Sequence, residues 1–378
     1  MSKQKTIFIT AGGTGGHLFP AETLARGLMA QDYQIVFITD KRGVAYQTLA
    51  PAATVKQVCS ATFGGGIVGK IAPMFKIGIG ILQSMALIIK HRPKAIVGFG
   101  GYPSFPAMFA GTILRVPTIL HEQNAVLGKA NAFLAKFARK IGLSHKETAD
   151  LPAPIAAKSV FTGNPIRDDI AEIANTPYPE ITDDNTINLF IMGGSQGAHS
   201  FSDIIPKAII ALPDDLKKRL HITQQCRPED IEDVTKAYAD HKISADLQSF
   251  FDNVPMLFKQ CHFFIGRSGA STVSEVTVIG RPSLFVPLMS HADQQQRRNA
   301  QAIVDGGAAQ MMLPDDFTAE KLCTLLSDHL SHPDKLQKMA TDIQEYGRLD
   351  AKDALVDLVL SITAPDMTTK QAPTAEAS

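Results

Sequence analysis

The sequence predicts two doubly wound α/β domains in tandem, and three observations indicate this architecture. Short apolar runs typical of strands alternate with helix-like segments along most of the 378 residues. A strand-like run ends in a glycine turn near the start, and the same pattern returns at Gly193, which lies 181 residues after Gly12. The length also exceeds what a single hydrophobic core usually organises.

The expected strands are spread evenly over both halves. Those of the first half are residues 6–10, 34–39, 95–99, 118–120, 140–143 and 159–161. Those of the second half are residues 187–192, 220–223, 262–265, 283–286 and 309–312. Helical patterns fill the intervals, which favours parallel sheets with helices on both faces.

Composition indicates where one domain ends and the next begins. The polar stretch NTPYPEITDDNT and the preceding GNPIRDD lie between the two strand-rich halves, as a linker would. We expect a first domain over 1–164, a second over 165–345, and a helix over 346–363 that packs back on the first domain. The last segment, 364–378, is polar and bears prolines, which predicts a disordered tail.

The bulk numbers are those of a soluble globular protein. Apolar residues make up 45% of the chain and charged residues 20%. Lys and Arg number 37, as do Asp and Glu, so the formal net charge is zero and no nucleic-acid partner is expected. Four scattered cysteines without a C-x-x-C pair favour a reducing, cytoplasmic setting and argue against a metal site.

One apolar stretch, residues 77–89, leaves two interpretations open. Lys76 precedes it, and Lys90, His91 and Arg92 follow it. Its uncharged length is shorter than the roughly 20 residues that a membrane-spanning helix needs. It is either a helix buried in the core or an interfacial patch, in which apolar side chains enter the membrane surface while the bases meet anionic lipid.

The first glycine turn, in IFITAGGTGGHLFPA, has the character of an anion site. Its backbone N–H groups and the positive end of the following helix point to the same place. The turn lacks a Walker A Gly-Lys-Ser/Thr, and Leu18 stands where G-x-G-x-x-G requires glycine. His17, on the edge of the turn, can remove a proton from a hydroxyl or donate to a phosphate. The alternative is a helix-terminal histidine bonded to its own backbone.

Two further strand ends in the first half carry glycine-rich or polar turns. GFGGYPSFPA places Gly100, Gly101 and Tyr102 after one expected strand. HEQNAVLGKAN places the four polar residues 121–124 just past the next. Ligands of doubly wound sheets bind at such carboxyl ends of the strands.

The second half repeats this pattern with residues suited to a nucleotide sugar. IMGGSQGAHS forms another anion-ready turn with Ser195 as a hydroxyl donor. RSGASTVSE opens a helix in which Glu275 can accept the vicinal hydroxyls of a ribose; a carboxylate stabilised by the helix dipole is the structural alternative. FVPLMSHADQQQRRNA supplies amides, including Gln295, that suit sugar hydroxyls and form a poor metal set.

Seven motifs together resemble the MurG family of bacterial peptidoglycan N-acetylglucosaminyltransferases. They are GGTGGHLFPA, GFGGYPSFPA, HEQNAVLGKAN, GNPIR, GGSQGA, RSGASTVSE and HADQQQRRNA, in order over about residues 5–350. The resemblance implies a GT-B glycosyltransferase fold, with two doubly wound Rossmann-like domains facing a cleft. It implies UDP-N-acetylglucosamine as donor, lipid I as acceptor, and inverting transfer to the 4-hydroxyl to give lipid II, without cofactor or metal.

The resemblance also implies site residues and a location. The donor positions that match here are Thr14, Gly15, Gly16, Asn124, Arg167, Ser195, Phe251, Ala270, Ser271, Thr272, Val273, Ser274, Glu275 and Gln295. The acceptor diphosphate falls on Gly15, Gly100, Gly101 and Tyr102, and His17 is the implied catalytic residue. The implied enzyme is peripheral on the cytoplasmic face of the inner membrane, in contact with anionic lipid and with other cell-wall and division proteins.

The match has departures, and other classes compete with it. Gly266 stands where the family usually has cysteine, Ser271 replaces a usual leucine, and one extra residue makes Gln295 rather than Gln294 the matching glutamine. An NAD(P)-dependent oxidoreductase would use Asp40 for a ribose, but its first loop would be imperfect. A sugar-nucleotide epimerase of the same fold should carry paired catalytic carboxylates, which the sequence does not place. A binding module without catalysis leaves the ligand-type loops of both halves unexplained.

Overall fold

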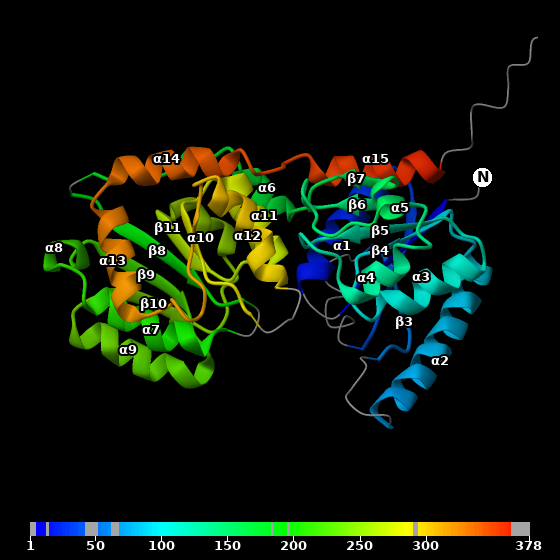
Figure 1. The fold of residues 1–378 in the computed structure, drawn as a ribbon, viewed down its shortest axis with the longest axis horizontal. Coiled ribbons are helices and arrows are strands. Elements are labelled where there is room, and N and C mark those ends of the chain that lie inside the picture. Colours follow the sequence, from blue (N-terminus) through cyan, green and yellow to red (C-terminus); the bar gives the residue numbers. More distant parts are fainter. Residues whose placement is uncertain are drawn as a thin grey trace, which may run out of the picture.

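Two parallel sheets, each at the centre of one domain, organise the chain (Figure 1). The computed structural model describes residues 5–12, 15–41, 52–61, 68–182, 184–194, 197–289 and 294–363, with the side chains of 68–72 left out. In the described part the strand orders are β3-β2-β1-β4-β5-β6-β7 and β10-β9-β8-β11-β12-β13. Both orders run outward in two directions from a central strand, which is the doubly wound arrangement. The predicted fold class is confirmed.

Every strand-like run predicted from the sequence is a strand, with ends that differ by at most two residues. The first sheet contains β1 (Thr6–Thr10), β2 (Gln34–Thr39), β3 (Thr54–Gln57), β4 (Ala95–Gly98), β5 (Thr118–Glu122), β6 (Lys140–Leu143) and β7 (Ser159–Phe161). The second contains β8 (Ile187–Met192), β9 (Leu220–Gln225), β10 (Ser244–Gln248), β11 (Phe263–Gly266), β12 (Ser283–Phe285) and β13 (Gln310–Met311).

The expectation for residues 121–124 needs a correction, because His121 and Glu122 are the last two residues of β5 rather than loop residues. Both side chains are buried. Because both residues are polar, the apolar run ends before the strand does. They tolerate burial because each makes hydrogen bonds there.

Helices cover both faces of each sheet. In the first domain they are α1 (Gly15–Met29), α2 (Val68–His91), α3 (Ser104–Ile113), α4 (Lys129–Leu134) and α5 (Ala153–Ala156). Those that follow are α6 (Asp168–Ile173), α7 (His199–Ile210), α8 (Asp214–Lys217), α9 (Ile231–Asp240), α10 (Val254–Gln260), α11 (Ala270–Ile279), α12 (Gln295–Asp305), α13 (Ala319–Leu330), α14 (Pro333–Gln344) and α15 (Ala351–Thr363).

Each sheet buries a separate apolar cluster on either face. In β1, Ile7 and Ile9 belong to one cluster and Phe8 to the other, as the two-residue period of a strand requires. Leu355 and Val359 of α15 join the cluster of Ile7 and Ile9. The last described helix therefore belongs to the core of the first domain, although the second domain precedes it; it packs against α1, and Figure 1 shows it along the upper edge of that domain. The predicted disordered tail, 364–378, lies outside the described residues.

The helix α2 is apolar on two opposite faces, of which only one is packed. Ile77, Ser84 and Ile88 are buried, and α2 packs against α3. On the other side Phe75, Leu82 and Ile89 repeat every seven residues with side chains that are 72%, 68% and 61% exposed. By length and composition alone, residues Pro73–His91 meet the criterion for a membrane span, but only 22% of that stretch is buried. Complete burial in the core, one of the two interpretations of this stretch, is therefore wrong.

Candidate active site

The carboxyl ends of the two sheets carry loops that meet at the interface between the domains. Thr23 of α1 donates its hydroxyl to the carbonyl of Ile166, at 3.2 Å, in the segment that joins the domains. From the second domain, the Asn299 Oδ1 accepts from the Ala125 N–H at 2.8 Å. The Asn299 Nδ2 donates to the Asn124 Oδ1 at 3.2 Å and to the Ser268 carbonyl at 3.1 Å. Asn299, which is 1% exposed, thus ties the HEQN loop to the RSG turn.

His17 is held by a chain of two side chains that ends at a backbone carbonyl. It lies in the first turn of α1, and its Nδ1 is 2.7 Å from the Oε1 of Gln123. The Nε2 of Gln123 is 3.0 Å from the Nδ1 of His121 and donates to the His121 carbonyl at 3.1 Å. The Nε2 of His121 is 3.0 Å from the carbonyl oxygen of Gly163. The interpretation of His17 as a histidine bonded only to its own helix is therefore wrong.

The second glycine turn lies against His17. Gly100 and Gly101 have φ angles of +86° and +72°, which residues with a side chain rarely adopt. A Cβ on Gly101 would lie 3.5 Å from the Cδ2 of His17, and one on Gly100 would lie 2.9 Å from the Nδ2 of Asn131. The positive φ angles favour glycine at both positions, and Gly101 faces the imidazole at van der Waals distance.

Glu122 shapes the loop after β5. Its Oε1 accepts from the N–H and the side-chain amide of Asn124, at 3.0 and 3.1 Å. Its Oε2 accepts from the Gly128 N–H at 3.1 Å and from the Asn131 Nδ2 at 2.7 Å. The carboxylate fixes Asn124 and also Asn131, which touches the Gly100 turn. The sequence interpretation missed Asn131, although it is the last residue of the HEQNAVLGKAN motif.

Arg167 and Glu275 form a buried ion pair beside α1. The Arg167 Nε and Nη2 donate to the two Glu275 carboxylate oxygens at 2.9 and 3.2 Å. The guanidinium carbon of Arg167 also lies 5.2 Å from the ring centre of Phe19 in α1, so the pair reaches across the domain interface. Burial raises the pKa of Glu275, and the guanidinium opposes that rise. Each carboxylate oxygen has a second lone pair with which to accept a hydroxyl.

The start of α11 presents polar groups without protein partners. The hydroxyls of Ser268 and Ser271 are buried and make no hydrogen bond in the described structure. Together with the free N–H groups of a helix start, they suit an anionic or hydroxylated ligand. Gln295 begins α12 and faces the HEQN loop, since a Cβ on Gly128 would lie 3.6 Å from its Nε2.

The other sequence-predicted site residues fall into three groups. Gly15 and Gly16 begin α1, and Tyr102 is 37% exposed in the turn beside His17. Ala270, Ser271, Thr272, Val273 and Ser274 form the first half of α11, with Ala270 and Val273 buried. Thr14 and Ser195 lie outside the described residues.

Phe251 is less suited to contact a ligand through its ring. Its side chain is 6% exposed and packs edge-on against Phe190 in the core, while the neighbouring Phe250 is 67% exposed. A ligand contact at this position would therefore involve the backbone of Phe251 rather than its ring.

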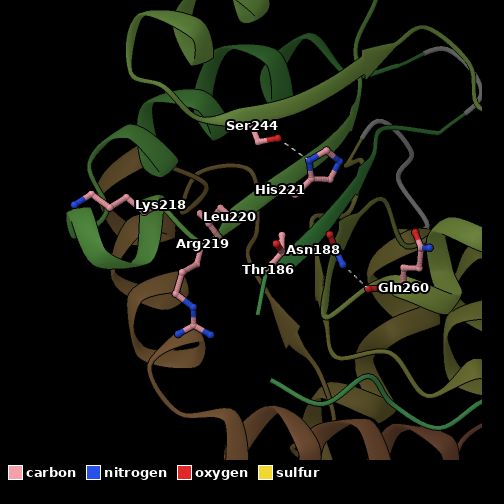
Figure 2. A pocket seen from close by; sticks show the side chains of 8 residues that line it. All are labelled: Thr186, Asn188, Lys218, Arg219, Leu220, His221, Ser244 and Gln260. Carbon is pink, nitrogen blue, oxygen red and sulfur yellow. Dashed lines mark hydrogen bonds between the residues drawn. The ribbon is translucent and has the colours of Figure 1, made fainter. Parts of the chain in front are cut away.

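A separate hollow of about 520 Å³ lies at the opposite, amino end of the second sheet. Figure 2 shows residues that line it, with His221 of β9 bonded to Ser244 of β10 and Asn188 of β8 bonded to the Gln260 carbonyl. None of the residues that line this hollow belongs to the seven motifs. Because ligands of doubly wound sheets bind at carboxyl ends, the domain interface rather than this hollow is the candidate site.

Two buried histidines should make the protein sensitive to acid. Burial lowers the pKa of His121 and of His262 from 6.5 to about 4. Between pH 6.5 and about pH 4 these histidines are therefore protonated in the unfolded chain but neutral in the folded chain. We expect the free energy of unfolding to fall over this window by up to about 3 kcal/mol for each histidine. Urea titrations at several pH values measure it; because burial also lowers the pKa of His145 to about 4, His262→Gln should remove only its own share of the dependence, whereas replacing the exposed His241 should remove none.

Two doubly wound domains with a histidine and a helix start suited to phosphate at their interface have the architecture of a GT-B enzyme that acts on a nucleotide sugar. Residues 7–143 match the glycosyltransferase family 28 N-terminal domain, and residues 188–355 match the C-terminal domain of the same family. The chain is an enzyme that belongs to glycosyltransferase family 28.

Its relatives are similar over nearly their whole length. One from Paramagnetospirillum magneticum is 43% identical over 96% of this chain and 98% of the relative, and one from Rhodospirillum centenum is 43% identical over 94% and 93%. Both are named UDP-N-acetylglucosamine–N-acetylmuramyl-(pentapeptide) pyrophosphoryl-undecaprenol N-acetylglucosamine transferase. The crystal structure of Acinetobacter baumannii MurG is 29% identical, covers 94% of this chain and 99% of that one, and gives a TM-score of 0.77. The resemblance to the MurG family is thereby confirmed.

Proposed function

We propose that this enzyme transfers N-acetylglucosamine from UDP-N-acetylglucosamine to the 4-hydroxyl of N-acetylmuramic acid in lipid I, which yields lipid II for peptidoglycan. The names of relatives at 43% identity support these substrates. The single structural observation that carries the proposal is His17, held between the glycine turn at Gly101 and the HEQN loop, which Asn299 ties to the second domain.

The residues suggest how the transfer proceeds. The turns at Gly15 and Gly100 hold the acceptor diphosphate, and His17 faces the reacting hydroxyl. As the hydroxyl oxygen bonds to the anomeric carbon, its proton passes to the imidazole. The bond from that carbon to UDP breaks, and its electron pair stays on the diphosphate. N–H groups at the start of α11, with Arg167 and the serine hydroxyls, stabilise that charge.

The test is a transfer assay with labelled UDP-N-acetylglucosamine and a lipid I analogue. We expect labelled disaccharide-lipid and one released UDP for each transfer. A second reaction without acceptor tests the rival epimerase activity. Conversion of the donor sugar to its C2 epimer without acceptor, and no transfer with it, would contradict the proposal.

We also propose that the enzyme is peripheral on the cytoplasmic face of the inner membrane, with the outer face of α2 on the lipid. Phe75, Leu82 and Ile89 supply exposed apolar area, and Lys76 and Lys90 are exposed on the same helix. Phe133 in α4 and Phe137 just after it, 41% and 46% exposed, add apolar surface to the same domain, since α3 packs against both α2 and α4. The polyprenyl chain of lipid I holds its diphosphate at the same surface.

Charge reversal at Lys76 and Lys90 should weaken binding to vesicles that contain phosphatidylglycerol. Each base contributes roughly 1 kcal/mol near an anionic surface, so the double variant should bind at least about 30-fold more weakly. Lys70, also expected to contribute, has a side chain outside the described residues. Flotation at low and high salt measures the effect, and reversal of the exposed Lys236 and Lys259 in the second domain is the matched control. Equal flotation of both double variants would contradict the assignment of this face.

A further inference from the structure

The hydrogen bonds behind His17 determine which of its two nitrogens carries the proton. We infer that His121 and Gln123 are positioning residues that hold neutral His17 in the Nδ1–H form, so that Nε2 is the nitrogen free to accept a proton. The inference rests on the proposed transfer reaction only for the use made of that nitrogen.

The chain starts at His121, whose protonation is decided by its surroundings. The ring is fully buried, and burial lowers its pKa to about 4, so it is neutral at pH 7 and carries one proton. Its Nε2 lies 3.0 Å from the Gly163 carbonyl, which can only accept. The proton is therefore on Nε2, and Nδ1 presents a lone pair to Gln123.

His121 then orients the amide of Gln123. The Gln123 nitrogen lies 3.0 Å from the Nδ1 of His121 and 3.1 Å from its carbonyl oxygen, and both of these atoms accept. The reverse orientation of the amide would place its oxygen against two acceptors inside a side chain that is 1% exposed. The amide nitrogen consequently faces His121, and the amide oxygen faces His17.

Gln123 in turn sets the form of His17. Its Oε1 can only accept, and it lies 2.7 Å from the His17 Nδ1, which must be the donor. An isolated imidazole prefers its proton on Nε2, so this network reverses the intrinsic preference. The freed Nε2 adjoins Cδ2, the ring atom that lies 3.5 Å from a Cβ built on Gly101, and thus faces the turn proposed to hold the acceptor.

A neutral amide also preserves the charge balance. A carboxylate at position 123 would hold the same tautomer but would favour the imidazolium, and His17 would then reach its basic form only at higher pH. Gln123→Glu should therefore retain transfer at alkaline pH and move the acidic limb of the pH–rate profile upward. An acidic limb that does not move would contradict the role of His17, in contact with position 123, as the base.

The tautomer is measured directly in the full-length chain. Long-range proton–nitrogen NMR spectra of protein labelled with ¹⁵N-histidine distinguish the two forms, and the signal missing from His17→Gln identifies His17. We expect the Nδ1–H form in the parent and a loss of that form in Gln123→Met, with turnover lowered roughly 10- to 100-fold and UDP affinity unchanged. The Nε2–H form in the parent, or an unaltered tautomer in Gln123→Met, would overturn the inference.

Two substitutions of His121 form a matched pair. His121→Asn keeps an oxygen near the position of Nδ1, to accept from Gln123, but loses the bond to Gly163. His121→Gln keeps a donor near the position of Nε2 but loses the acceptor. Both should lower the melting temperature, yet only His121→Gln should disturb the tautomer of His17. Disturbance by His121→Asn alone would overturn the chain of bonds. The spectra need no acceptor substrate. They therefore test the tautomer of His17 even if the enzyme does not catalyse the proposed transfer.

Discussion

Replacement of His17 by alanine should lower turnover by about 10²-fold or more while donor binding stays nearly intact. Loss of a positioned acid–base group typically has this size. His17 lies in the first domain, between Gln123 and the Gly101 turn, whereas Arg167 follows the join between the domains and Glu275 lies in α11 of the second domain.

Steady-state assays with UDP-N-acetylglucosamine and a lipid I analogue measure the loss, and calorimetry with UDP measures donor affinity. Replacement of His241, an exposed histidine of the second domain that caps α9, is the control and should leave both unchanged. An alanine variant with native melting temperature and unaltered turnover would remove His17 from the reaction.

Glu275→Ala should cost about 3 kcal/mol of stability, because it removes the closest carboxylate partner of Arg167 and leaves only Asp169, 3.9 Å away and 52% exposed. The Glu275 side chain is 7% exposed and that of Arg167 23%, so water replaces the lost bonds poorly. If Glu275 also accepts a ribose hydroxyl, affinities for UDP and for UDP-N-acetylglucosamine should fall together, by roughly 1.5–3 kcal/mol.

Two further variants separate stability from binding. Glu275→Gln removes the charge but keeps an acceptor, and we expect an intermediate loss of both. Asp150→Asn breaks the exposed pair with Arg298, 3.1 Å long, which also joins the two domains. It should cost no more than about 1 kcal/mol and leave UDP affinity unchanged. Equal UDP affinity for Glu275→Ala and the parent would contradict the ribose contact.

The fold could be predicted well because the central strands have clear sequence signals. β1 and β8 are apolar runs that end at glycines, and burial on both sheet faces leaves them little choice of residue. The edge strands β3 and β10 were not predicted, because they are not buried on both faces of the sheet. Their side chains are partly or fully exposed, so no apolar run marks them. Their pairing with β2 and β9 supplies the order that their composition does not indicate.

The strand–turn–helix units, the repeat of one domain plan and the polar residue types at the strand ends could be read from the amino-acid order, because they depend on local periodicity and on glycine. Which of those residues contact one another became clear only in the folded protein. His17 and Gln123 are 106 positions apart, and Arg167 and Glu275 are 108 apart. The outer stripe of α2 is apolar like its packed stripe, and the position of α3 and of the β2 and β3 side of the core decides which one is buried. Hydrogen-bond partners and burial are properties of neighbours in space, and the order of residues along the chain does not encode them locally.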